Sequence, residues 1–312
     1  MRWPAYGRQA RYAVREGVRY LLAQQDPAGL WHDYSLPPGP SDAWTTAWVG
    51  WCLAGSEAPA AATARRHAAA ALLALRQPNG WGYNASTGPD ADSTAWAVRF
   101  LASLGVASGP QVQACLEGYL DALGHAHTFP DLPNSWGAAH SDVTPVVGLA
   151  LLAIGSSPQI VLRVRRAVLV TYRPDGGWPS FWWSADAYAT AWSLIFLARS
   201  GGIPAQVRSE GVRWLAVHAD SGSAMESACQ LLAAVTLQPG AGPIAANIVD
   251  DLLDAFDSSA GAWPPSPVLL VPRADRLGAA EPTEAHADGR RLMTTALSCV
   301  ALQRWLYTTD RS

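Results

Sequence analysis

A tryptophan-containing turn recurs along the chain and limits what it can fold into. In four copies a Gly-Trp or Gly-x-Trp turn, and in the third the turn Ser135-Trp136-Gly137, separates an amphipathic helical pattern from a more apolar one. The spacing is about 40 to 55 residues. A sixth unit fits between the last two copies, with its turn near residues 220–222 lacking Trp. Because one helical hairpin cannot bury its apolar face alone, six stacked hairpins are predicted. The turn tryptophans are Trp31, Trp81, Trp136, Trp178 and Trp263.

The first helix of each unit has a charged face and the second is apolar nearly all round, so the second helices are expected to be the inner ones. This pattern predicts an all-α fold, an (α/α)6 barrel spanning residues 1–312 as a single domain, without strands. The irregular stretch 264–290 before the last inner helix is either a lid or rim loop of the cavity or a disordered excursion. Outer helices are expected at 8–24, 59–75, 110–123, 158–170, 205–218 and 243–256, and inner helices from Asp42, Asp92, Asp142, Asp186, Ser223 and Arg291.

Composition excludes several functions. The chain is 49% hydrophobic with a formal net charge of −3, which offers no basic field for nucleic acid. All basic residues are Arg, and the absence of Lys excludes Schiff-base chemistry and a phosphate-binding P-loop lysine. The four cysteines lie far apart without metal-ligand spacing, so free thiols and no metal site are expected. No targeting segment or membrane span is recognisable, and a cytoplasmic protein is expected.

Aligning the inner helices on their shared Thr-Ala step places one residue of each helix in a ring at the barrel mouth. Asp92 and Asp142 belong to this ring, above a second ring rich in Trp. If this face points inward, burial raises the pKa of Asp92, and aromatic faces surround a space suited to carbocations. Equally, Trp at helical spacing can be core filler and Asp90 a helix cap. The first ring is Trp44, Asp92, Asp142, Tyr188, Met225 and Met293, and the second is Trp48, Trp96, Val146, Trp192, Cys229 and Leu297.

Other acidic and basic side chains allow further interpretations. Asp90, Asp92, Asp142 or Glu226 could form a carboxylate pair acting on sugars stacked on Trp, as in carbohydrate-active α/α barrels. Alternatively, the barrel could carry a lipid without catalysis. The acids at 250, 251 and 254 fall on an outer helix and are interpreted as a solvent face rather than a magnesium site. Arg99, one turn below Trp96, either contacts an anionic head group or pairs with an acid.

The segment Asp90-Ala-Asp92-Ser93-Thr94-Ala95 resembles the Asp-x-Asp-Asp-Thr-Ala motif of class II terpene cyclases, the squalene-hopene cyclase type. The turn Gln25-x-x-x-Gly29-x-Trp31 matches the Gln-Trp repeat of that family, and Asp142-Val143-Thr144 resembles a segment that follows in the same order. The chain resembles the single barrel that holds the acid, without the second barrel of the larger cyclases.

The resemblance implies that Asp92 is the general acid, supported by Asp90 and Asp142, and that a polyprenyl chain cyclises in the cavity. It also implies an isoprenoid partner and no required cofactor, with Mg²⁺ involved only if the substrate carries a diphosphate. Peripheral membrane contact is a further expectation, and the oligomeric state is left open. Two positions depart from the family: Ser93 replaces the last Asp of the motif, and Val146 stands where hopene-forming enzymes have His. His140 is a candidate substitute for that His.

Overall fold

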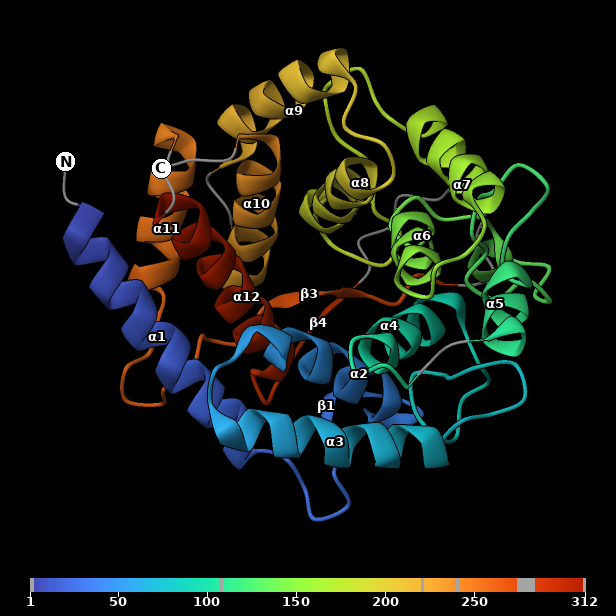
Figure 1. Cartoon of the computed structure of the whole chain (residues 1–312), viewed down its shortest axis with the longest axis horizontal. Coiled ribbons are helices and arrows are strands. Elements are labelled where there is room, and N and C mark those ends of the chain that lie inside the picture. Colours follow the sequence, from blue (N-terminus) through green and yellow to red (C-terminus); the bar gives the residue numbers. More distant parts are fainter. Residues whose placement is uncertain (1–2, 107–108, 220–221, 239–241, 274–283, 311–312) are drawn as a thin grey trace.

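The computed structural model describes residues 3–106, 109–219, 222–238, 242–273 and 284–310. In these ranges it forms an outer and an inner layer of helices arranged in a ring (Figure 1). The outer helices are α1 (Trp3–Ala23), α3 (Pro59–Ala74), α5 (Pro110–Glu117), α7 (Pro158–Val170), α9 (Ala205–His218) and α11 (Pro243–Asp254). The inner helices are α2 (Ala43–Cys52), α4 (Ala91–Ala102), α6 (Thr144–Ala153), α8 (Ala187–Arg199), α10 (Ala224–Leu237) and α12 (Leu292–Thr309).

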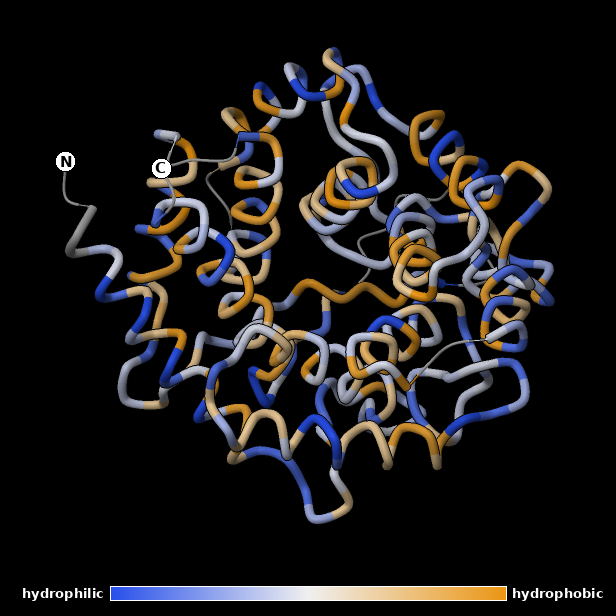
Figure 2. Tube along the Cα trace, viewed as in Figure 1, coloured by the Kyte–Doolittle hydropathy of each residue, from blue (hydrophilic) through white to orange (hydrophobic). Residues whose placement is uncertain are grey.

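The two layers differ in how much of each helix is buried. In the outer helix α7, the apolar stripe Val161, Val164 and Val168 is buried and the other faces are more exposed. In the inner helix α6, every residue from Thr144 to Leu151 is buried. The hydropathy of the chain follows this division (Figure 2), which confirms the predicted all-α barrel and its assignment of inner and outer helices.

The recurring turns join the layers through two hydrogen bonds each, which we call the Trp clasp. At Trp178 the indole Nε1 donates to the carbonyl of Val168 at the end of α7, 2.7 Å away. The Trp178 backbone N–H donates to the hydroxyl of Thr190 on α8, at 3.1 Å. The Thr of the aligned Thr-Ala step is therefore the residue that fixes α8 to its turn. The same two bonds form at Trp31, Trp81 and Trp263.

The third unit departs from the predicted phase. The backbone N–H of Ala126, rather than that of Trp136, donates to the hydroxyl of Thr144, at 3.0 Å. The indole of Trp136 instead donates to the carbonyl of Pro272, at 2.7 Å. The bond to the inner helix in this unit thus comes from Ala126 and not from a Trp. The predicted position of the turn at Trp136 is wrong, because Trp136 contacts Pro272 instead. Most of the fifth turn, predicted at 220–222, lies outside the described residues.

Two inner helices begin at other residues than expected. Asp90, not Asp92, caps α4, which places Asp92 inside the first turn. Asp142 precedes α6, which begins at Thr144, and Pro145 occupies a first-turn position where its missing N–H costs no hydrogen bond.

The prediction that strands are absent is wrong, because two short antiparallel hairpins form. One pairs β1 (Asp33–Leu36) with β2 (Gly39–Ser41), and the other pairs β3 (Pro267–Leu270) with β4 (Ala285–Ala287). Strands of three or four residues are too short to show an alternating pattern in sequence.

The described parts of the stretch 264–290 lie across the end of the barrel where the inner helices begin; residues 274–283 of this stretch are not described. The backbone N–H of Leu270 on β3 donates to the carbonyl of Trp182 at 2.8 Å, just before α8. The backbone N–H of Met225 at the start of α10 donates to the hydroxyl of Ser266. In Figure 1, β3 crosses the middle of the ring of helices. This end of the barrel is therefore covered by β3.

Candidate active site

Asp90 and Asp92, at the start of α4, have different hydrogen-bond partners. The carboxylate of Asp90 accepts the backbone N–H of Ser93 at 2.8 Å, and the residue is buried. Asp92 accepts the indole N–H of Trp44 on α2, with 2.9 Å between Nε1 and Oδ2. Its other oxygen, Oδ1, is buried and has no hydrogen-bond partner in the structure. Asp90 is thus the cap, and Asp92 presents an unengaged oxygen to the interior.

Burial raises the pKa of Asp92 well above the usual value of an Asp, and the neighbouring charges of Asp90 and Asp142 raise it further. The Trp44 hydrogen bond and the positive charge of Arg99 oppose this shift. Burial also raises the pKa of Asp90 and of Asp142, each to about 6. Burial and these neighbouring charges therefore favour the protonated form of Asp92.

Asp142 is fully buried and ties α6 to the segment before α8. Its Oδ2 accepts the backbone N–H groups of Phe181 and Trp182, at 2.9 and 2.8 Å. Its Oδ1, like that of Asp92, is buried without a hydrogen-bond partner. Asp142 therefore positions the loop that precedes α8 as well as adding negative charge near Asp92.

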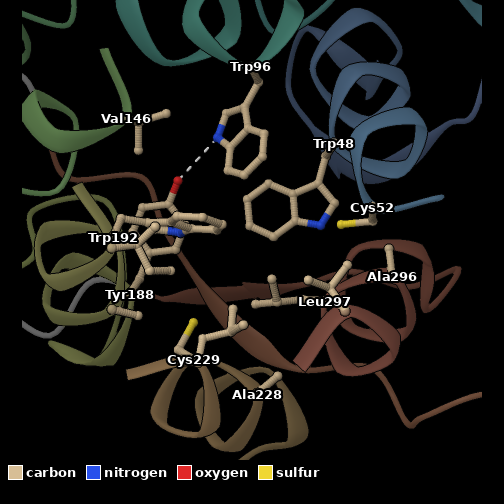
Figure 3. Packing of buried hydrophobic residues seen from close by; sticks show 14 of the residues in the cluster. Trp48, Cys52, Trp96, Val146, Tyr188, Trp192, Ala228, Cys229, Ala296 and Leu297 are labelled. Atoms are coloured by element: carbon tan, nitrogen blue, oxygen red, sulfur yellow. Dashed lines mark hydrogen bonds between the residues drawn. The ribbon is translucent and has the colours of Figure 1, made fainter. Parts of the chain in front are cut away.

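The second ring of the alignment meets in the centre of the barrel (Figure 3), where Trp48, Trp96 and Trp192 point toward one another beside Val146, Cys229 and Leu297. The rings of Trp48 and Trp96 have centroids 4.3 Å apart. The Trp96 indole N–H donates to the hydroxyl of Tyr188 at 3.2 Å. From the first ring, Met225 and Met293 are buried at the starts of α10 and α12. The interior is thus aromatic and polarizable, and burial raises the pKa of the Cys229 thiol, which favours its neutral form.

Arg99 lies among indole rings rather than beside an acid, which is one of the two partners expected from the sequence. It is 3% exposed, and within the described residues its guanidinium pairs with no acid. Instead its Cζ lies over the indole rings of Trp96, Trp51 and Trp192, at 4.0, 4.5 and 4.6 Å from their centroids. Burial lowers the pKa of Arg99 to about 9, so it remains charged at neutral pH.

Sequence reasoning missed two aromatic residues of this interior. Trp183 is buried and stacks on Tyr188 with ring centroids 4.2 Å apart. The run Phe181-Trp182-Trp183 was a signal for it, although the run belongs to a loop without helical period. Trp51, one turn beyond Trp48, would have been found by extending the aligned rings further down the helices.

His140 does not take the place of the missing His. It is buried, and its two ring nitrogens lie 2.7 Å from the Thr128 hydroxyl and 3.0 Å from the Ser135 carbonyl. Since a carbonyl only accepts, Nε2 donates to Ser135 and Nδ1 accepts from Thr128. Burial lowers the pKa of His140 to about 4, so the ring is neutral and occupied. Ser93 is also accounted for, because it supports Asp90 rather than Asp92.

The other acids named from the sequence are less buried than Asp90 and Asp142. Asp42 caps α2, as predicted, and Asp186 at the start of α8 pairs with Arg173 and accepts the backbone N–H of Ser180. Glu226 is in the first turn of α10, where it accepts the N–H of Gly222. The acids at 250, 251 and 254 are exposed on α11, as predicted. No group of three or more potential metal ligands occurs among the described residues, and none of the described helices could span a membrane.

The barrel, with its acid cluster at one end, has the fold of the type II terpene cyclases. Neither a family model nor a curated protein matches the chain. The chain is similar to the type II terpene cyclase MstE from Scytonema, with 24% identity over 97% of this chain and 99% of that one and a TM-score of 0.85.

Two other solved structures extend the comparison. A protein from Actinoplanes is 29% identical over 95% of this chain and 99% of its own, with a TM-score of 0.81. The ent-copalyl diphosphate synthase from Streptomyces platensis is 20% identical over 83% of this chain, with a TM-score of 0.63, and the match spans 50% of that longer chain. MstE has been solved with geranylgeranyl dihydroxybenzoate as substrate and with merosterolic acid A as product.

Proposed function

We propose that the protein is a class II terpene cyclase in which Asp92 protonates the terminal alkene of a polyprenyl chain. The observation that carries this proposal is the buried Asp92 carboxyl group, which has one oxygen free of hydrogen bonds and whose protonated form is favoured by burial and by two neighbouring acids. Buried carboxyl groups with a raised pKa are the kind of group that enzymes use as general acids. The fold shared with MstE supports the same conclusion.

In the proposed reaction the Asp92 O–H proton passes to the terminal carbon of the alkene. The electron pair of the double bond forms the new C–H bond, a tertiary carbocation remains on the other alkene carbon, and Asp92 becomes a carboxylate. The next alkene attacks this cation and closes a ring. Loss of a proton, or addition of water followed by loss of a proton, ends the sequence. Trp44 orients the acid through its indole N–H throughout.

Three aromatic residues close to the acid are proposed to stabilise the first cations. Trp48, Trp183 and Tyr188 stack on one another, with Trp48 6.2 and 6.1 Å from the other two. Aromatic faces attract positive charge without forming bonds to it. In the structure these side chains fill the centre of the barrel, so a substrate has to take up space that they now occupy.

The proposed substrate class rests on the similarity to MstE and on the role proposed for Asp92. We propose a polyprenyl chain bearing an aromatic acid, as in the MstE complexes, and consider a prenyl diphosphate as the second head group. Mg²⁺ is needed only with the diphosphate. We further propose that the chain acts as one barrel domain.

The proposal is tested by incubating the purified protein with geranylgeranyl dihydroxybenzoate and with prenyl diphosphates with and without Mg²⁺, followed by mass analysis and NMR of the products. Asp92→Asn should lower turnover by about 10²- to 10⁴-fold, because a positioned general acid contributes this much. Asp254→Asn, on the exposed face of α11, is the matched control and should retain turnover. Equal turnover in Asp92→Asn contradicts the proposal. Tight retention of a lipid without any product would point to the carrier alternative, and binding of sugars to the carbohydrate alternative.

A further inference from the structure

Arg99 differs from two arginines of the outer helices, Arg65 on α3 and Arg165 on α7, in what its guanidinium contacts. Arg65 donates to the Gly50 carbonyl at 2.9 Å, and Arg165 donates to the carbonyls of Leu197 and Gly202 at 3.0 and 2.6 Å. Those two satisfy carbonyls near the ends of inner helices. The Nη1 and Nη2 atoms of Arg99, in contrast, are buried and have no hydrogen-bond partner in the structure.

Three indoles hold Arg99 in place of hydrogen bonds. Trp51 on α2, Trp96 on α4 and Trp192 on α8 surround the guanidinium, at the distances given above, and this set is called the indole box. A guanidinium over aromatic faces is stabilised by the ring quadrupoles. The sequence predicts that Trp96 and Trp192 face a cation of the substrate. In the structure they face the guanidinium of Arg99.

Arg99 lies on the same helix as Asp92 and seven residues further along, which is about 10 Å of α-helix. The acid and the guanidinium are close enough to interact, because the charge of Arg99 opposes the upward shift of the Asp92 pKa. Trp48 connects the two groups, because its ring contacts Trp44, which holds Asp92, and also two rings of the indole box. The cation–π contacts of Arg99 do not include Trp48. Repulsion between two positive charges is strong where water is excluded. A carbocation is thus favoured beside Asp92 and disfavoured beside the indole box.

We propose that Arg99 is a specificity-determining residue that forms the floor of the reaction chamber and confines positive charge to the part of the chain nearest Asp92. This inference rests on the proposed function and deepens it. Arg99 would set how many isoprene units take part in ring formation, since each further ring moves the cation away from the protonated end. The substrate class that fits has only its tail end cyclised, with the remaining chain or head group outside the charged region.

Two stable cationic analogues test this inference without turnover. In one, a tertiary ammonium replaces the first tertiary carbon at the tail end of a prenyl chain, and in the other it replaces the equivalent carbon two isoprene units nearer the head group. Their Kd values are measured by isothermal titration calorimetry on the wild-type protein, Arg99→Met and Arg99→Lys. We expect the tail-end analogue to bind at least about 10-fold more tightly to the wild-type protein and to Arg99→Lys, because both keep the fixed charge.

In Arg99→Met the preference should fall to less than about threefold, because the repulsion is gone. A preference that is the same in Arg99→Met as in the wild type overturns the inference, and so does failure of the wild type to bind either analogue. Arg99→Gln, which is neutral and polar, replaces Arg99→Met if the latter does not give the native circular dichroism spectrum. The proposed function fails separately, when Asp92→Asn retains turnover, whatever the ratio of the two Kd values.

Discussion

Asp92 and Arg99 lie two turns apart on the same inner helix, and their surroundings act on their charges in opposite ways. Around Asp92, burial and two further acids favour the neutral form of the carboxyl group. Around Arg99, three indole faces stabilise the charged form of the guanidinium, which remains protonated at neutral pH. One end of helix α4 therefore favours a protonated carboxyl group that can serve as a proton donor, and the other end holds a fixed positive charge.

This difference indicates how a barrel of aromatic residues can give direction to a cationic reaction. Aromatic faces alone stabilise positive charge wherever it forms. A fixed cation at one end and anions at the other make the acid end more favourable. The predictions below test the two ends separately.

The largest effect is expected at the acid end. Asp142→Asn keeps an oxygen that accepts the backbone N–H groups of Phe181 and Trp182, but removes a negative charge that raises the pKa of Asp92. The lower pKa leaves more Asp92 ionised, so we expect kcat to fall about 10- to 100-fold at about pH 8. The alkaline limb of the pH profile of kcat should move to lower pH. A limb at the wild-type position would contradict the role given to Asp142.

The buried acids Asp92 and Asp288 also predict how stability depends on pH. The pKa of Asp92 is raised on folding, and that of Asp288 is raised by burial to about 7, so the folded protein binds more protons than the unfolded chain above pH 4. Stability contributed by these groups is therefore lost as pH rises through their folded pKa values. His140, with its pKa lowered to about 4, acts in the opposite direction only below about pH 6.5.

We therefore expect the free energy of unfolding to fall by on the order of 2 kcal/mol between about pH 6.5 and 8.5. Urea denaturation at a series of pH values measures this. The slope should be smaller in Asp92→Asn, which removes one of the groups. If the free energy of unfolding rises over this pH interval, the buried acids do not determine how stability depends on pH.

Much of this organisation is visible in the sequence, and the reason is the Trp clasp. Because a Thr hydroxyl of each clasped inner helix accepts from its turn, the Thr-Ala step marks the same height on successive helices. Aligning on it therefore placed Trp48, Trp96 and Trp192 at one level, and the structure brings them together. Five residues past the Thr, the same alignment places Trp51 of α2 level with Arg99 of α4, and these two residues are in contact. The first two rings do not include this pair.

Other features depend on contacts that no repeat encodes. Trp136 resembles a clasp residue in sequence, and only the tertiary contact with Pro272 shows that it serves the covering segment instead. Trp183 enters the interior from a loop held by Asp142 and β3, so its position follows from two distant elements. The two hairpins form where Pro and Gly interrupt the chain between a turn and the next inner helix, and their strands are too short to read from periodicity.

The clasp itself gives the next prediction, since its bonds fix the beginnings of the inner helices at the acid end. Trp178→Phe retains a buried ring but leaves the Val168 carbonyl without its donor. We expect the free energy of unfolding to fall by about 1 to 2 kcal/mol. Trp136→Phe is the matched control, because its half-buried indole donates to the Pro272 carbonyl rather than across a clasp. Urea denaturation compares them, and an equal or greater loss in Trp136→Phe would contradict the special role of the clasp.

The smallest effect is expected at the opposite end of α4. Arg99→Met removes a buried charge whose Nη1 and Nη2 atoms have no hydrogen-bond partner, so the stabilisation lost is only that of the indole faces. Replacing a buried charge with an apolar side chain of similar length is often neutral or stabilising, and we expect a change within about 1 kcal/mol, of either sign. Arg165→Met, which loses hydrogen bonds to the Leu197 and Gly202 carbonyls, should destabilise by more. Thermal unfolding compares the two variants. If Arg99→Met is destabilised more than Arg165→Met, Arg99 contributes mainly to folding stability, which would contradict its proposed role in specificity.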